Sequence, residues 1–110
     1  MATMRSTKGY KKQIAEEAVE LAEAPQTGAL IMIRVSAGAG EKVAKELAKF
    51  DRVEDVYAIM GESDLAIKVR FASQKELKQF LMTDVSAIDG IENTRTLLIM
   101  DTYKDAGLVV

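Results

Sequence analysis

Apolar and polar side chains recur along the chain with two different periods. Residues 11–24 and 41–50 place apolar side chains every three or four positions, which is the spacing of one face of an α-helix. Residues 65–71 alternate apolar with polar side chains, as a strand with one buried face does. Residues 29–35 form an almost unbroken apolar run that favours a strand buried on both faces. The pattern therefore predicts a mixture of helices and strands.

Three more elements complete the prediction. Residues 53–60 and 65–71 should pair as a hairpin, because the Gly-Glu-Ser-Asp segment between them has the chemistry of a tight turn. Ser73 followed by Glu76 is a capping-box signature, which predicts a helix start. The buried stripe expected on that helix consists of Leu77, Phe80, Leu81, Val85 and Ile88. Residues 91–100 predict the last strand, followed by a short mixed tail.

This order of elements, βαββαβ, predicts the α+β class. We expect a ferredoxin-like fold, in which a four-stranded antiparallel sheet carries two helices on one face, with an extra N-terminal helix over residues 11–24. Two helices leave the other face of the sheet open. The side chains expected on the open face are Leu30, Met32, Arg34, Ala66, Lys68 and Arg70. Because half of them are apolar, the pattern predicts self-association.

Length, composition and charge exclude several functions. A chain of 110 residues holds one domain, and its net charge of -2 supplies no excess of cations for direct binding of nucleic acid. Cys 0 and His 0 remove thiol nucleophiles, imidazole bases and the usual zinc and iron ligands, so no metal and no cofactor are expected. No apolar run approaches the ~20 residues of a membrane span, and the N-terminus lacks a secretory signal. We therefore expect a cytoplasmic protein without a membrane segment.

Carboxylates are the remaining candidates for chemistry. Glu62 with Asp64, and Glu54 with Asp55, are pairs that general acid–base catalysis can use. Turn carboxylates more often cap a backbone or stay solvated, and no nucleophile accompanies them, so no catalytic residue is assigned. Four cations are expected on the sheet, namely Arg34, Lys68, Arg70 and Arg95. In an acidic chain with few aromatic residues, they favour ion pairs over a nucleic-acid surface.

Residues 29–100 resemble the C-terminal effector domain of the Lrp/AsnC family of feast/famine regulators. The resemblance rests on the apolar segment 29–35, the segment 53–57, the hairpin 60–65 with its Gly and Asp, and the segment 90–96 with its Thr-x-Thr. It implies an N-terminal extension at 1–28, an effector-binding and oligomerisation domain at 29–102, and a tail at 103–110. Family members usually carry a DNA-binding helix-turn-helix domain in front, for which 28 residues are too few. The chain is thus similar to the stand-alone effector modules.

The resemblance also implies a ligand and partners. Small amino acids bind such domains where dimers meet, and the positions carried over are Met60, Gly61, Glu62, Ser63, Asp64, Thr94 and Thr96. Gly61 would allow close backbone approach and Asp64 would pair with the ligand ammonium, although Asp64 is equally suited to capping the turn. Relatives form dimers through their sheet faces and then higher rings such as octamers. Full-length Lrp/AsnC regulators are further candidate partners.

Three functional hypotheses remain open at this point. The leading one is a non-catalytic amino-acid-binding and oligomerisation module that acts in transcriptional or metabolic regulation through partner proteins. The second is a pure assembly protein without a ligand. The third is a small dimeric ferredoxin-like enzyme, which the lack of His disfavours. The apolar stripe of residues 11–24 suits the chain's own domain, a second copy or another regulator, and we favour pairing within the oligomer.

Overall fold

The computed structural model describes residues 27–110. The helix expected over residues 11–24 lies outside that range. In chain order the elements are β2 (Thr27–Val35), α2 (Gly40–Leu47), β3 (Val53–Ala58), β4 (Leu65–Phe71), α3 (Gln74–Gln79), the π-helical turn η1 (Phe80–Val85), β5 (Ile91–Leu98), β6 (Lys104–Asp105) and β7 (Leu108–Val109). Strands 2 to 5 and the two helices follow the predicted βαββαβ order.

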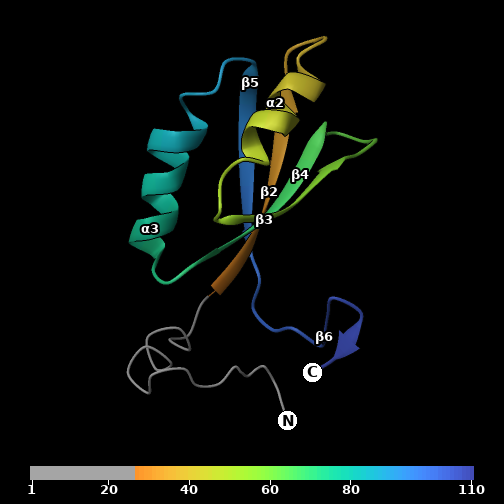
Figure 1. Cartoon of the computed structure of the whole chain (residues 1–110), viewed down its shortest axis with the longest axis vertical. Helices are drawn as coiled ribbons and strands as arrows, with labels where there is room; N and C mark the ends of the chain where they lie inside the picture. Colours follow the sequence, from red (N-terminus) through yellow and green to blue (C-terminus); the bar gives the residue numbers. More distant parts are fainter. Residues whose placement is uncertain (1–26) are drawn as a thin grey trace.

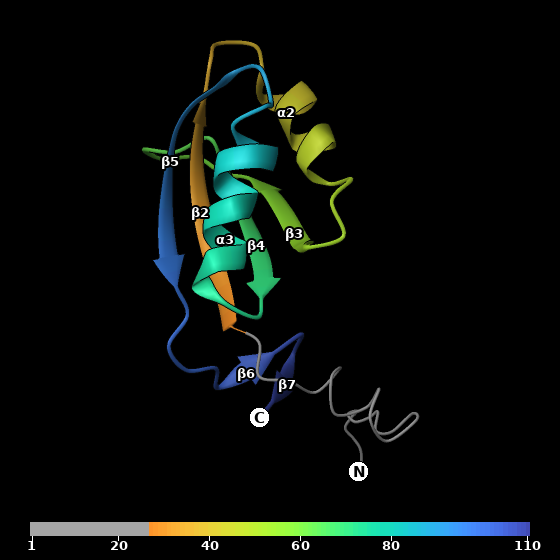
Figure 2. The same ribbon diagram turned by 90° about the vertical axis from the view of Figure 1, so that its left-hand side faces the viewer.

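The main sheet is antiparallel and has four strands in the order β3-β4-β2-β5. Both helices lie on the same face of this sheet, as the two perpendicular views show (Figures 1 and 2). The first strand of the described residues, β2, therefore lies inside the sheet, between β4 and β5, and the hairpin strand β3 forms one edge. This arrangement confirms the predicted ferredoxin-like fold.

The core lies between the sheet and the helices. Alternate side chains of β2 and β4 face the helices and are buried, and they are Ala29, Ile31, Ile33, Leu65, Ile67, Val69 and Phe71. Val43 and Leu47 of α2 and Leu77 of α3 close the core from the other side. The expectation that β2 is buried on both faces was wrong, because two of its side chains on the open face are exposed: Leu30, at 38%, and Arg34.

The second helix contains one extra residue in its last turns. Its buried side chains are Leu77, Phe80, Val85 and Ile88. The interval from Phe80 to Val85 is five positions, whereas an α-helix would place the next buried side chain three or four positions on. A π-helical turn adds the residue that brings Val85 to the core, and Ser86 N accordingly donates to Leu81 O. Leu81, expected in the buried stripe, is only half-buried. The α-helical part ends at Gln79, earlier than the pattern predicts.

Two strands are also shorter than predicted. β3 ends at Ala58 because the next residue, Ile59, donates its amide to Asp64 O and closes the turn. β5 ends at Leu98, and after the bond from Ile99 N to Gly28 O the chain leaves the sheet. The tail then forms a small hairpin of β6 and β7, seen beyond the end of the sheet in both views (Figures 1 and 2).

Candidate functional site

The tip of the β3–β4 hairpin is fastened to the end of β2. Asp64 makes two of the bonds to β2: its amide donates to Ile33 O at 2.8 Å, and its Oδ2 accepts from Val35 N at 2.9 Å. Its carbonyl accepts from Ile59 N at 3.0 Å and closes the hairpin turn itself. Arg34 Nη2 donates to Glu62 O at 2.6 Å. The carboxylate of Asp64 thus has a structural role, because it satisfies a backbone amide where the β2–β5 ladder changes register between Arg34 and Val35.

Beside this tip lies a cavity of about 100 Å³. Its lining comes from the strands β2 and β5 and from the turn, and consists of Met32, Arg34, Glu62, Ser63, Asn93, Thr94 and Arg95. The register explains the grouping, because Met32 lies opposite Arg95 and Arg34 opposite Asn93 on the open face of β2 and β5. The cavity therefore joins the hairpin tip to the open face of the sheet.

The charges around this cavity differ from those at the other end of the open face. Within residues 27–110, neither Arg34 nor Arg95 forms an ion pair, and Glu62 forms none either. In the part of the chain that the structure describes, the guanidinium of Arg34 donates only to the carbonyl oxygen of Glu62. The site thus presents cations from the strands and an anion from the turn around one small hollow.

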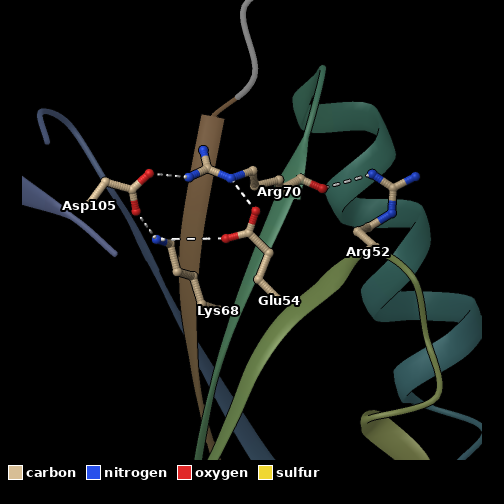
Figure 3. Close-up of polar contacts among 5 residues, drawn as sticks. All are labelled: Arg52, Glu54, Lys68, Arg70 and Asp105. Atoms are coloured by element: carbon tan, nitrogen blue, oxygen red, sulfur yellow. Dashed lines mark hydrogen bonds and ion pairs between the residues drawn. The ribbon is translucent and has the colours of Figure 1, made fainter. Parts of the chain in front are cut away.

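At the other end of the face, four charged side chains neutralise one another (Figure 3). Lys68 Nζ lies 3.4 Å from Asp105 Oδ1 and 3.7 Å from Glu54 Oε1. Arg70 pairs with Glu54 through Nε and with Asp105 through Nη2, the latter at 3.5 Å. Asp105 comes from the C-terminal hairpin, so this charged quartet holds the tail against β4. Arg52 donates to the carbonyl oxygen of Arg70 at 3.0 Å and, also at 3.0 Å, to Glu76 of α3, which extends the contacts to that helix.

The expectation of ion pairs among the sheet cations is thus confirmed for Lys68 and Arg70. Glu54 is committed to both of these cations and is not free to act as an acid or a base with Asp55. In the described part of the chain, no group of three or more acidic side chains is placed to hold a metal ion. Residues 27–110 also contain no helix that is long and apolar enough to cross a bilayer.

The structure brings some of the predicted site residues together and separates others. Glu62, Ser63 and Thr94 line the cavity. Met60 is fully exposed at the tip, and a Cβ on Gly61 would meet nothing within 4 Å, so the backbone there is accessible. Thr96 lies elsewhere: it pairs with Ile31 and lines a groove beside α3 on the helix-covered side of the sheet.

Sequence reasoning missed four of the cavity's residues, namely Met32, Arg34, Asn93 and Arg95. The sequence places Arg34 and Met32 on one face of their strand by alternation alone. It does not show which residues of the last strand lie beside them, because that depends on the register between two strands far apart in the sequence.

Comparison with known proteins extends this description. Residues 28–109 match the family profile of the Lrp/AsnC ligand binding domain. The HTH-type transcriptional regulator FL11 of Pyrococcus horikoshii is 35% identical over 77 residues, which are 70% of this chain and 50% of FL11. The chain thus spans about half the length of the curated relatives it matches.

Solved structures agree with the fold. AsnC of E. coli is 25% identical to the chain with a TM-score of 0.68, and the match covers 86% of this chain and 61% of AsnC. A transcriptional regulator of Neisseria meningitidis, solved as its L-Met complex, has a TM-score of 0.70 at 18% identity and covers 94% of this chain and 66% of its own. The second likeness establishes the shared fold alone.

Proposed function

Because the chain belongs to the Lrp/AsnC ligand binding domain family, we propose that it is a non-catalytic module that binds a free amino acid and self-associates. It acts in transcriptional or metabolic regulation through partner proteins, among which longer Lrp/AsnC regulators are the first candidates. The curated relatives are named as transcriptional regulators, and they are about twice as long as the part they share with this chain.

The observation that carries the proposal is the arrangement of charges at the cavity. A free amino acid is a zwitterion, with a carboxylate and an ammonium group a few ångströms apart. Arg95 and Arg34 can bind the carboxylate through charge-assisted hydrogen bonds, and Glu62 can accept from the ammonium. Oδ1 of Asp64 has no hydrogen-bond partner within residues 27–110, so Asp64 can cap its strand and still add negative charge near the ammonium.

The size of the cavity argues that a single copy holds only half of the site. Pockets that enclose small ligands usually measure about 300 to 1,000 Å³, and this one measures about 100 Å³. The exposed tip of the hairpin and the apolar open face offer surfaces on which a second copy can complete the enclosure. Ligand binding and self-association are therefore proposed as parts of one function.

The test is a thermal melt of the whole chain, followed by circular dichroism, with each of the twenty amino acids in millimolar excess. The L-Met complex of the Neisseria meningitidis regulator makes methionine and other apolar amino acids the first to try. A ligand present at 100 times its Kd adds about 2.7 kcal/mol to the stability of the folded protein, which raises the midpoint by several degrees.

Two variants decide whether the binding occurs at this cavity. R95Q removes a guanidinium that lines the cavity, so the ligand-induced shift should fall to near zero while the unliganded midpoint stays within a degree or two. K49Q, which changes an exposed cation near the end of α2, is the control and should keep the full shift. If none of the twenty amino acids raises the midpoint, ligand binding is refuted and the chain is an assembly protein. A shift that R95Q leaves intact refutes this cavity as the site.

A further inference from the structure

A second hollow lies on the helix-covered side of the sheet, away from the proposed amino-acid site. It is a groove of about 670 Å³ between α3 with its π-turn and the strand β5. Its lining is mostly apolar and includes Leu77, Leu81, Met82, Thr96 and Leu98. Met82 is 65% exposed and Leu98 is 49% exposed, so apolar surface is left open to water here.

The groove also lies along an unprotected edge of the sheet. β5 is the last strand in the order β3-β4-β2-β5, so its outer backbone groups have no neighbouring strand in the described part of the chain. Proteins commonly cover such edges with a helix or a loop, because a bare edge invites pairing with other chains. A segment that covered the groove would bury its apolar lining and would also shield the exposed edge of β5.

The path of the chain points to an occupant. Thr27, the first residue of β2, lies two residues before Ala29, and Ala29 is paired with Leu98 of the groove. At about 3.3 Å per residue, the chain joins the sheet ~7 Å from the level of the groove. Residues 11–24 would span about 21 Å as a helix, close to the ~18 Å covered by the twelve residues of α3 and η1. Pro25, which ends a helical pattern, and Gln26 are the residues between that segment and the start of β2 at Thr27.

We propose that residues 11–24 of the same chain fold as an amphipathic helix into this groove. The stripe of Ile14, Ala18 and Leu21 faces Leu77, Met82 and Leu98 and covers the edge of β5. From the apolar stripe alone we favoured pairing of residues 11–24 with another copy in the oligomer. The groove changes this preference, because it opens close to the point where the chain enters the sheet.

Charge complementarity supports this occupant. Lys75 and Lys78 lie on the rim of the groove, three positions apart on the same helix. Neither forms an ion pair with a carboxylate of residues 27–110. Glu17 and Glu20 have the same spacing, and helical geometry places Glu17 at the border of the apolar stripe next to Leu21. An acidic border on the segment thus matches a basic rim on the groove.

The test uses the full-length chain, which has Cys 0, so engineered thiols react without interference. The variant A18C/M82C is treated with a short bismaleimide, and the products are identified by mass. We expect a cross-link within one chain. The control A18C/A48C, which places the second thiol on the exposed end of α2, should give no such product. A mixture of A18C and M82C chains should give no product of two chains.

Charge reversal provides an independent measurement. Hydrogen exchange in residues 11–24 should become roughly fivefold faster in K75E/K78E, as expected from losing two partly exposed ion pairs. Adding E17K/E20K should restore the slow exchange, whereas K42E/K49E, with Lys42 on α2 and Lys49 just after it, should leave the exchange unchanged. A cross-link only between different chains would assign the groove to a second copy and overturn the proposal. Unprotected amides in residues 11–24 of the unmodified chain would overturn it as well.

Discussion

At the scale of single residues, Gly90 has little freedom to change. Its φ is +103°, and a Cβ on it would lie 2.9 Å from Cβ of Ala39 and 3.2 Å from Cγ2 of Val43. Its carbonyl accepts from Ser36 N at 2.8 Å. Gly90 therefore lets the chain enter β5 while the loop before α2 packs directly against its backbone.

We predict that G90A lowers the free energy of unfolding by about 2 to 4 kcal/mol, because it combines backbone strain with a steric contact in the core. Urea denaturation measures this. G38A is the matched control, because Gly38 has a φ of +83° with nothing within 4 Å of the added Cβ. It should cost only about 1 kcal/mol. Equal losses in the two variants would show that the contact with Ala39 contributes nothing.

The same scale shows how far single residues can be predicted. Gly61 and Asp64 are recognisable in the sequence because turn chemistry is local, and the structure places them in the hairpin turn. Arg95 was recognised as a cation of the sheet but not as part of a cavity. Its place beside Ser63 and Glu62 results from a strand register and a folded-back turn, both of which depend on contacts between distant residues.

At the scale of elements, the start of α3 makes a specific prediction about pH. Ser73 Oγ accepts from Glu76 N, as the capping box predicts, but Glu76 Oε1 accepts from Ala72 N at 2.8 Å, one residue earlier than in the usual box. Arg52 holds the same oxygen at 3.0 Å. The bond from Ala72, followed by the bond from Arg52, lowers the pKa of Glu76 below its ordinary value of 4.5.

A carboxyl group with a lowered pKa in the folded state stabilises the protein above its unfolded pKa, and the stabilisation is lost as the pH falls through the folded value. The free energy of unfolding should thus decrease below about pH 4.5 in part because Glu76 is protonated. E76Q should be less stable than the unmodified chain at pH 7, and the difference should shrink toward acid pH. Urea denaturation from pH 7 to pH 3 measures it. E92Q, on the exposed start of β5, is the control, and a pH-independent difference for E76Q would contradict the assignment.

The sequence predicts some elements better than others. An element is predictable when the residues that determine it are close together in the chain. The start of α3 was predictable because Ser73 and Glu76 are three residues apart. The π-turn was not, because its extra residue serves to bring Val85 into a core whose shape other elements determine. The tail hairpin was not predicted either, since Asp105 is held there by Lys68 and Arg70, more than thirty residues earlier in the chain.

At the scale of the whole molecule, the open face of the sheet should be the surface through which two copies associate. Leu30 and Leu97 are paired neighbours at its centre, 38% and 45% exposed, and Tyr57 is 56% exposed on β3. The charged quartet is neutralised within one chain, so it does not repel its counterpart on a second copy. Such a two-fold interface uses the same patch on both copies, and every substitution in it therefore acts twice.

We predict that L97E separates the associated copies, because two carboxylates would be buried against apolar surface and against each other. The Kd for self-association should rise at least about 100-fold, which corresponds to ~2.7 kcal/mol. Sedimentation equilibrium measures the mass, and circular dichroism confirms that the monomer keeps its fold. A48E, on the helix-covered side, should keep the mass of the unmodified chain. Because the proposed amino-acid site needs a second copy to complete it, L97E should also lose the amino-acid-induced rise in midpoint. An L97E chain that retains its associated mass would place the interface on another surface of the domain.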